Sequence, residues 1–335
     1  SISIAAGSSA SQQGGNVAIQ SGSGHESSGS VLLASADAIA TSSGNVVVQS
    51  GTTTQASSGS LKIASGSSAS ANGGDVTVTA GNSGAGIGGS IALSAGSSST
   101  EAGGSVRIQS GASSSTRATN AGDVAITTAG SAGSSGSVEV WTGDSASAET
   151  GSVSIVTGNS LADTAGQITI QAGNSDTSAG SSVSILGSSS TSEGGSVVIT
   201  SGRSNDDISG AMTVATAPGF AGSGQIDVFT GSTFDGSSGS LVLQSGHAMH
   251  GQGGSVHLSV GESSSGQAGS IVAATGRSLG NDQAGFVYLG SGATTATPSG
   301  SIIVESGSSN QASSGDVTLT TGTTSIGQSG KIMLS

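Results

Sequence analysis

The sequence predicts an all-β fold, a parallel β-solenoid (β-helix) of 23 short strands, and three observations support this prediction. A strand-like phrase recurs at a mean interval of about 15 residues, which is typical of an array whose units stack on their neighbours. Apolar and polar residues alternate within the phrase, and glycine directly precedes 21 of the 22 later phrases. We number each unit from the residue before its first aliphatic residue, and the units begin at residues 1, 16, 30, 45, 60, 75, 90, 105, 123, 137, 152, 167, 182, 196, 211, 225, 240, 255, 270, 286, 301, 316 and 331.

Aliphatic residues occupy two fixed positions of the unit. Position 2 is Val, Ile, Leu or Met in all 23 units, and position 4 is Val, Ile or Leu in all but the one that holds Ala273. Positions 3 and 5 are mixed. Alternation with a period of two predicts a strand with one buried face, so we expect positions 2 and 4 to point inward. Small residues at positions 6, 9 and 14, and glycine at position 7, predict the turns between strands.

A flexible linker and a helix are the alternatives to this array. Low complexity is typical of a Gly/Ser linker, but a linker gives no reason for aliphatic residues at two fixed positions. Glycine at every seventh or eighth residue argues against a helix. We therefore expect residues 1–335 to form one continuous repeat array. Because the sequence lacks an initiator methionine, we also expect it to be a segment of a longer chain.

Differences between odd-numbered and even-numbered units predict two repeats in each coil, which would form two facing parallel sheets. Position 1 is Ser in nine of the twelve odd units but in only four of the eleven even units. At position 3 of the even units, this arrangement would place Arg107 beside Glu139, and Asp227 beside His257, on adjacent coils.

Composition excludes several classes of protein. The formal net charge is −13, and the cations are only Lys62, Lys331 and four Arg, so we expect no nucleic-acid partner. The absence of Cys excludes disulfides, and no apolar run is long enough to predict insertion into a membrane.

Candidate chemistry is sparse. His247 and His250 form an HxxH pair, with His257 nearby, and this pattern suggests a metal site. We favour exposed loop residues instead, because no acidic cluster joins them, and we interpret Asp206 and Asp207 as solvent-exposed loop residues. We therefore expect no enzyme activity, no catalytic residue, no bound metal and no cofactor.

Two sets of residues are candidate contacts. The first is the odd face, positions 3 and 5 of the odd units, where small and aliphatic side chains would suit lateral packing. Its candidate interface residues are Val242, Val272, Ile303, Met333, Ala5, Ala34 and Ala64. The second set is aromatic and lies in even units, where outward rings either form a contact surface or are merely tolerated; its members are Trp141, Phe229 and Tyr288, with Phe286 beside them.

The phrase GGSVxIxSGxSS resembles the Ser/Gly-rich short repeats of large surface or filament proteins of algae and oomycetes. This resemblance covers the whole chain, and it implies an extracellular structural role in a cell coat, a fibre or a flagellar hair. It carries over no catalytic residues.

The leading hypothesis is therefore a structural protein of an extracellular filament or coat. It would assemble end to end and laterally with copies of itself or other filament subunits, and its loop Ser and Thr residues could carry O-linked glycans. An ice- or mineral-binding β-solenoid is the alternative, although positions 3 and 5 lack the regular outward Thr that an ice-binding face requires. A polysaccharide-active enzyme is a third and weaker hypothesis.

Overall fold

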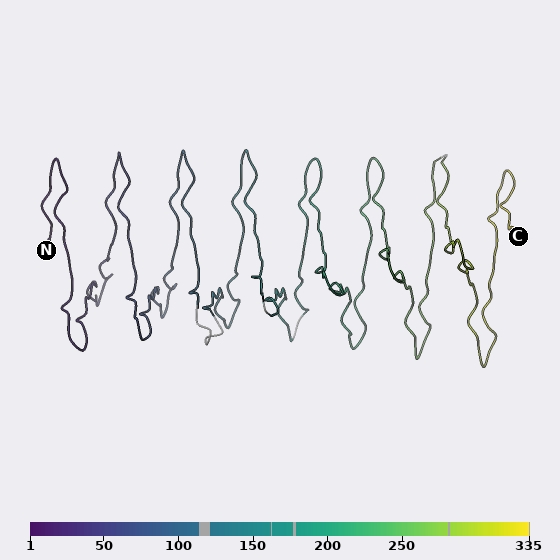
Figure 1. Cartoon of the computed structure of the whole chain (residues 1–335), viewed down its shortest axis with the longest axis horizontal. Coiled ribbons are helices and arrows are strands. Elements are labelled where there is room, and N and C mark those ends of the chain that lie inside the picture. Colours follow the sequence, from purple (N-terminus) through teal and green to yellow (C-terminus); the bar gives the residue numbers. More distant parts are fainter. Residues whose placement is uncertain (114–120, 162, 177–178, 281, 335) are drawn as a thin grey trace. The chain divides into compact units, whose positions relative to one another are not determined.

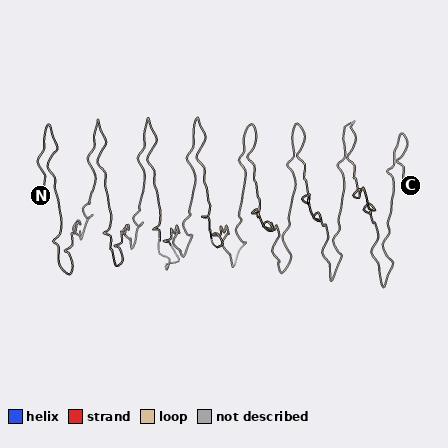
Figure 2. Cartoon of the chain, in the orientation of Figure 1, coloured by secondary structure: helices blue, strands red, loops and turns tan. Residues whose placement is uncertain are grey.

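The computed structural model describes residues 1–113, 121–161, 163–176, 179–280 and 282–334. In these ranges the chain forms neither helices nor strands, and it runs as extended segments joined by tight bends (Figures 1 and 2). The prediction of an all-β solenoid with 23 strands in two facing sheets is therefore wrong, because the chain is mostly coil. It divides into two units, Ser1–Thr169 and Ile170–Ser335, and both are built from the same kinds of segment and loop.

Backbone hydrogen bonding explains why the extended segments do not become strands. A strand requires a ladder of N–H to C=O bonds with a neighbouring strand. Among the described residues there are nine backbone-to-backbone hydrogen bonds, and each joins the two ends of a loop. The segments that carry the alternating aliphatic residues form no ladder with one another, so their backbone is extended without belonging to a sheet.

The expected hydrophobic core is also absent. No side chain in the described ranges is buried, and the chain exposes 33313 Å² of surface. A folded monomer of 31.0 kDa would expose about 12,000 Å². The physical reason is the composition: the two aliphatic side chains of each repeat unit stabilise the chain less than the ordering of its Gly-rich backbone costs.

Side-chain hydrogen bonds within the segments follow the period of two. The Arg107 guanidinium donates through Nε and Nη2 to Gln109 Oε1 at 3.0 and 2.6 Å. Gln167 Nε2 donates to Thr169 Oγ1 at 2.8 Å. Residues two apart share one face of an extended backbone, which explains why these pairs meet.

The predicted contacts between coils are replaced by these local pairs. Arg107 binds Gln109 of its own segment, while Glu139 accepts a hydrogen bond from Ser137 Oγ at 3.5 Å. Asp227 accepts a hydrogen bond from Gln225 Nε2. The prediction of two repeats per coil, with Arg107 beside Glu139 and Asp227 beside His257, is wrong because no stacked coil supplies the distant partner.

Candidate functional site

Successive segments are joined by loops whose two ends meet at a neck. We define the neck as the residue at position 7 together with the residue directly before the next segment. In a closed neck, the N–H of the second residue donates to the C=O of the first, as from Gly15 to Gly7 at 2.8 Å and from Gly89 to Gly81 at 2.9 Å. The closed necks of the described ranges are 7/15, 22/29, 66/74, 81/89, 96/104, 111/122, 188/195, 202/210 and 292/300.

The two glycines of a neck differ in how much space a side chain would have there. A Cβ atom at Gly89 would lie 3.2 Å from Ala80 Cβ and 3.3 Å from Gly81 N, so the close approach of the chain leaves no ordinary space for it. A Cβ atom at Gly81 would meet no atom within 4 Å beyond its own chain neighbours. Neither glycine has a positive φ. At this closed neck, close approach therefore favours glycine before the segment, whereas nothing in the geometry requires glycine at position 7.

The side chain at position 6 limits which necks close. All nine closed necks have Ala, Ser or Gly at position 6, and none has a β-branched residue. At Thr142, the Cγ2 methyl lies 3.6 Å from the Cβ position of Gly151, and no hydrogen bond closes that neck. The extra methyl group of threonine occupies the space where the two backbones would meet. An unbranched residue is necessary but not sufficient, since the necks after Ser35 and Ser50 are also open.

Position 9 supplies a hydrogen bond that shapes the loop tip. Its Ser or Thr hydroxyl accepts from the backbone N–H three residues later, as from Gln12 to Ser9 Oγ at 3.0 Å and from Glu101 to Ser98 Oγ at 2.9 Å. Ser and Thr commonly bind nearby backbone groups in this way. Within the described ranges, the same bond is found in ten loops, formed by Ser9, Thr53, Ser68, Ser83, Ser98, Ser145, Ser160, Ser204, Thr294 and Ser309.

A second kind of tip has glycine at position 12 in a left-handed conformation. The φ angles of Gly236, Gly251, Gly266 and Gly327 lie between 96° and 139°, which disfavours any residue with a Cβ atom. In three of these loops the position-9 hydroxyl donates to a nearby carbonyl oxygen, as from Thr233 Oγ1 to Gly236 at 2.9 Å. The sequence analysis noted the Ser and Thr at position 9 but attributed them to small size. Their fixed place before the bend was the signal of a hydrogen-bonding role.

The aliphatic rows at positions 2 and 4 are exposed, which corrects the expectation that they point into a core. Between Val17 and Ile332, the position-2 side chains are 49 to 65% exposed, and the Val, Ile and Leu at position 4 from Ile4 to Leu319 are 59 to 77% exposed. Large apolar side chains at positions 3 and 5 are 71 to 89% exposed. Position 2 is therefore the most shielded of the four, although it is still half open to solvent.

The predicted contact residues are all exposed, each on its own segment. In the odd face, Val242, Val272, Ile303 and Met333 are 71 to 83% exposed, and Ala5, Ala34 and Ala64 are exposed as well. The rings of Trp141, Phe229 and Tyr288 are 73 to 82% exposed. Because nearly every described residue is exposed, exposure alone does not single out either set.

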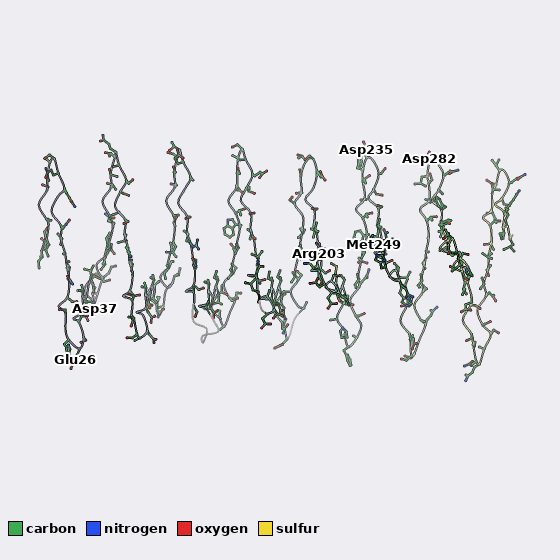
Figure 3. All side chains as sticks on the ribbon, viewed as in Figure 1. Glu26, Asp37, Arg203, Asp235, Met249 and Asp282 are labelled. Atoms are coloured by element: carbon green, nitrogen blue, oxygen red, sulfur yellow. The ribbon has the colours of Figure 1, made fainter. Side chains whose placement is uncertain are left out.

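The loop tips carry apolar side chains that the sequence analysis missed. Position 10, directly after the position-9 residue, holds Phe220, Phe234 and Met249, and each of these side chains is at least 85% exposed. Figure 3 shows Glu26 and Asp235 at the tips of bends. A large apolar residue at a fixed loop position was the signal available in the sequence.

The remaining candidate chemistry does not gather into a site. His247, His250 and His257 are exposed, and no cluster of three or more His, Asp or Glu suited to a metal ion is found in the part of the chain that is described. Asp207 Oδ1 accepts a hydrogen bond from the N–H of Ile208 at 2.8 Å, and Asp206 is exposed beside it. The described residues enclose no pocket, and no helix among them has the length and apolar character needed to cross a membrane.

No protein-family model, curated protein or solved structure matches the chain. The resemblance to the surface and filament proteins of algae and oomycetes therefore stays a prediction, and the functional argument depends on the geometry of the repeats.

Proposed function

We propose that the chain is a structural protein that associates with copies of itself in an extracellular filament, fibre or cell coat, and that it is not an enzyme. One observation carries this proposal: aliphatic side chains recur at positions 2 and 4 along the whole chain and are exposed to solvent throughout the described ranges. Exposed apolar surface on this scale marks interaction with another molecule. The contact is distributed over every unit, which suits an assembly rather than a reaction at one place.

The extracellular location and the O-linked glycans belong to the same proposal. The location is supported by the resemblance of the repeat to surface and filament proteins. Glycans are supported by the exposed hydroxyl groups of the loops, such as Ser99 at position 10, beside the position-9 hydroxyl that shapes the tip. Mass spectrometry of loop peptides from native material tests this part, and unmodified masses throughout would contradict it.

Sedimentation velocity and negative-stain imaging of the purified chain over a range of concentrations test self-association. We expect monomers at low concentration and filaments or sheets above a threshold, because each unit contributes the same small contact. Monomers at every concentration and salt condition would contradict the proposal. The odd face of Val242, Val272, Ile303 and Met333 stays a candidate for the lateral contact in such an assembly.

A further inference from the structure

The restriction of residue type at positions 2 and 4 has no explanation within a single chain. These positions accept only aliphatic residues in 45 of 46 cases, yet their side chains are half or more exposed. Large apolar side chains at positions 3 and 5 are more exposed, at 71 to 89%, and these positions accept Arg107, Glu139 and Gln171 as readily as valine. Because no position is buried in the described ranges, shielding within the chain does not account for so sharp a difference in permitted residue type. Contact with a second molecule accounts for the difference.

We propose that the rows at positions 2 and 4 are the primary contact surface between copies of this chain, with a second copy lying along the same segments. This inference rests on the proposed function, and it identifies which of the exposed rows carries the association. The odd face at positions 3 and 5 is then secondary.

The period of the rows points to a second copy as the partner. The aliphatic pairs recur once in every repeat unit over 23 units, so only a partner with the same spacing can meet them one after another. Another copy of the chain has that spacing because its sequence is identical. Each copy also brings extended segments without a backbone ladder, which are suited to lie along one another.

The exposed area is sufficient for such an association. The chain exposes 33313 Å², about 21,000 Å² more than a folded monomer of its mass. A stable protein–protein interface buries about 1,600 Å² in total, so a small fraction of this excess would suffice. The contact can therefore be spread thinly, with the two aliphatic residues of each unit contributing a little.

Charge distinguishes a second copy from a partner of opposite sign. With a net charge of −13 on each chain, two copies repel each other. Added salt screens this repulsion, and at 0.15 M ionic strength the Debye screening length is about 8 Å. Association of copies therefore strengthens with salt. Association with a cationic polymer would weaken instead, because salt would screen the attraction.

The experiment compares two triple variants made in the same three units. The position-2 variant is Leu241→Ser, Ile271→Ser and Ile302→Ser, whose side chains are 54 to 55% exposed. The matched position-3 variant is Val242→Ser, Val272→Ser and Ile303→Ser, on the odd face. Amide exchange at Gly300, whose N–H closes the neck with Gly292, checks that both variants keep the local structure.

Sedimentation of each purified chain, at low and at physiological salt, gives the threshold concentration for association. We expect the position-2 variant to raise the threshold about a hundredfold, the position-3 variant to change it less than about threefold, and salt to lower it for the wild type. The reverse order of the two variants would overturn the inference and identify the odd face as the contact, while self-association itself would stand. A wild-type chain that never associates would overturn both the inference and the proposed function.

Discussion

The described parts of residues 1–122 and of residues 123–335 contain the same kinds of segment and loop, but they differ in how often the necks close. Six of the eight necks in the first region are closed, against three of the fourteen in the second. Position 6 is Ala or Ser throughout the first region, whereas eight of the fourteen units of the second have Thr or Val there. A β-branched side chain at position 6 therefore accompanies an open neck, although some necks with Ala or Ser there are open as well.

The loop tips differ between the same two regions. All four left-handed glycines, Gly236, Gly251, Gly266 and Gly327, belong to the second region. The position-9 hydroxyl accepts the N–H of position 12 in both regions, as Ser68 does from Ala71 and Ser309 does from Ala312, each at 3.0 Å. The loop tip therefore has two forms in the second region, whereas no left-handed glycine shapes the described tips of the first.

The largest expected effect comes from filling the space at a closed neck. Gly89→Ala places a Cβ atom 3.2 Å from Ala80 Cβ, so the two backbones must move apart by a few tenths of an ångström, which weakens the hydrogen bond to the Gly81 carbonyl. We expect amide exchange at residue 89 to become about tenfold faster, which corresponds to the loss of about 1.4 kcal/mol, the upper part of the range for a hydrogen bond of this kind. The control is Gly81→Ala, where the new Cβ atom meets nothing within 4 Å. Equal effects of the two variants would contradict the steric account of the neck.

A smaller effect is expected when a position-6 residue of one region is replaced by the residue type common in the other region. Ala95→Thr adds the methyl group found in open necks, and it should accelerate amide exchange at Gly104 about fivefold by breaking its bond to Gly96. The reciprocal change Thr142→Ala should slow exchange at Gly151, measured by NMR. If Gly104 exchanges at the same rate in the wild type and in Ala95→Thr, position 6 does not control closure.

The smallest effect is expected at the loop tip. Ser98→Ala removes the hydroxyl that accepts the N–H of Glu101 at 2.9 Å, and exchange at Glu101 should become about threefold faster. Ser99→Ala, one residue later in the same loop, is the matched control and should leave that rate unchanged. A rate that responds to both substitutions alike would show that the tip depends on the backbone and not on the position-9 hydroxyl.

Local features of the chain could be predicted from the sequence, whereas long-range pairing could not. Alternation at positions 2 and 4 indicates residues that share one face, and side-chain pairs such as Gln167 with Thr169 do follow that period. Alternation does not say whether another segment lies alongside, because this depends on contacts far apart in the chain. The pairing of Arg107 with Glu139 failed for this reason, since Gln109 offers a partner without any stacking.

The candidate site shows the same division. The small residue at position 6 and the glycine before each segment were visible in the sequence, and the neck gives both a steric reason. The hydrogen-bonding role of Ser98 and its counterparts was missed because hydroxyl residues are abundant and composition alone does not distinguish them. The exposure of Ile170, at 71%, could not be predicted, because aliphatic alternation looks the same whether a partner comes from the same chain or from another.

The central claim is that the aliphatic rows are covered by other copies of the chain, and hydrogen exchange before and after association tests it most directly. In dilute monomer, we expect slow exchange only near closed necks such as 96/104 and near the position-9 bonds. In the associated state, we expect new protection at positions 2 to 5, recurring once in every repeat unit along the chain. Protection confined to the loops, or segments that exchange at the monomer rate after association, would contradict the claim.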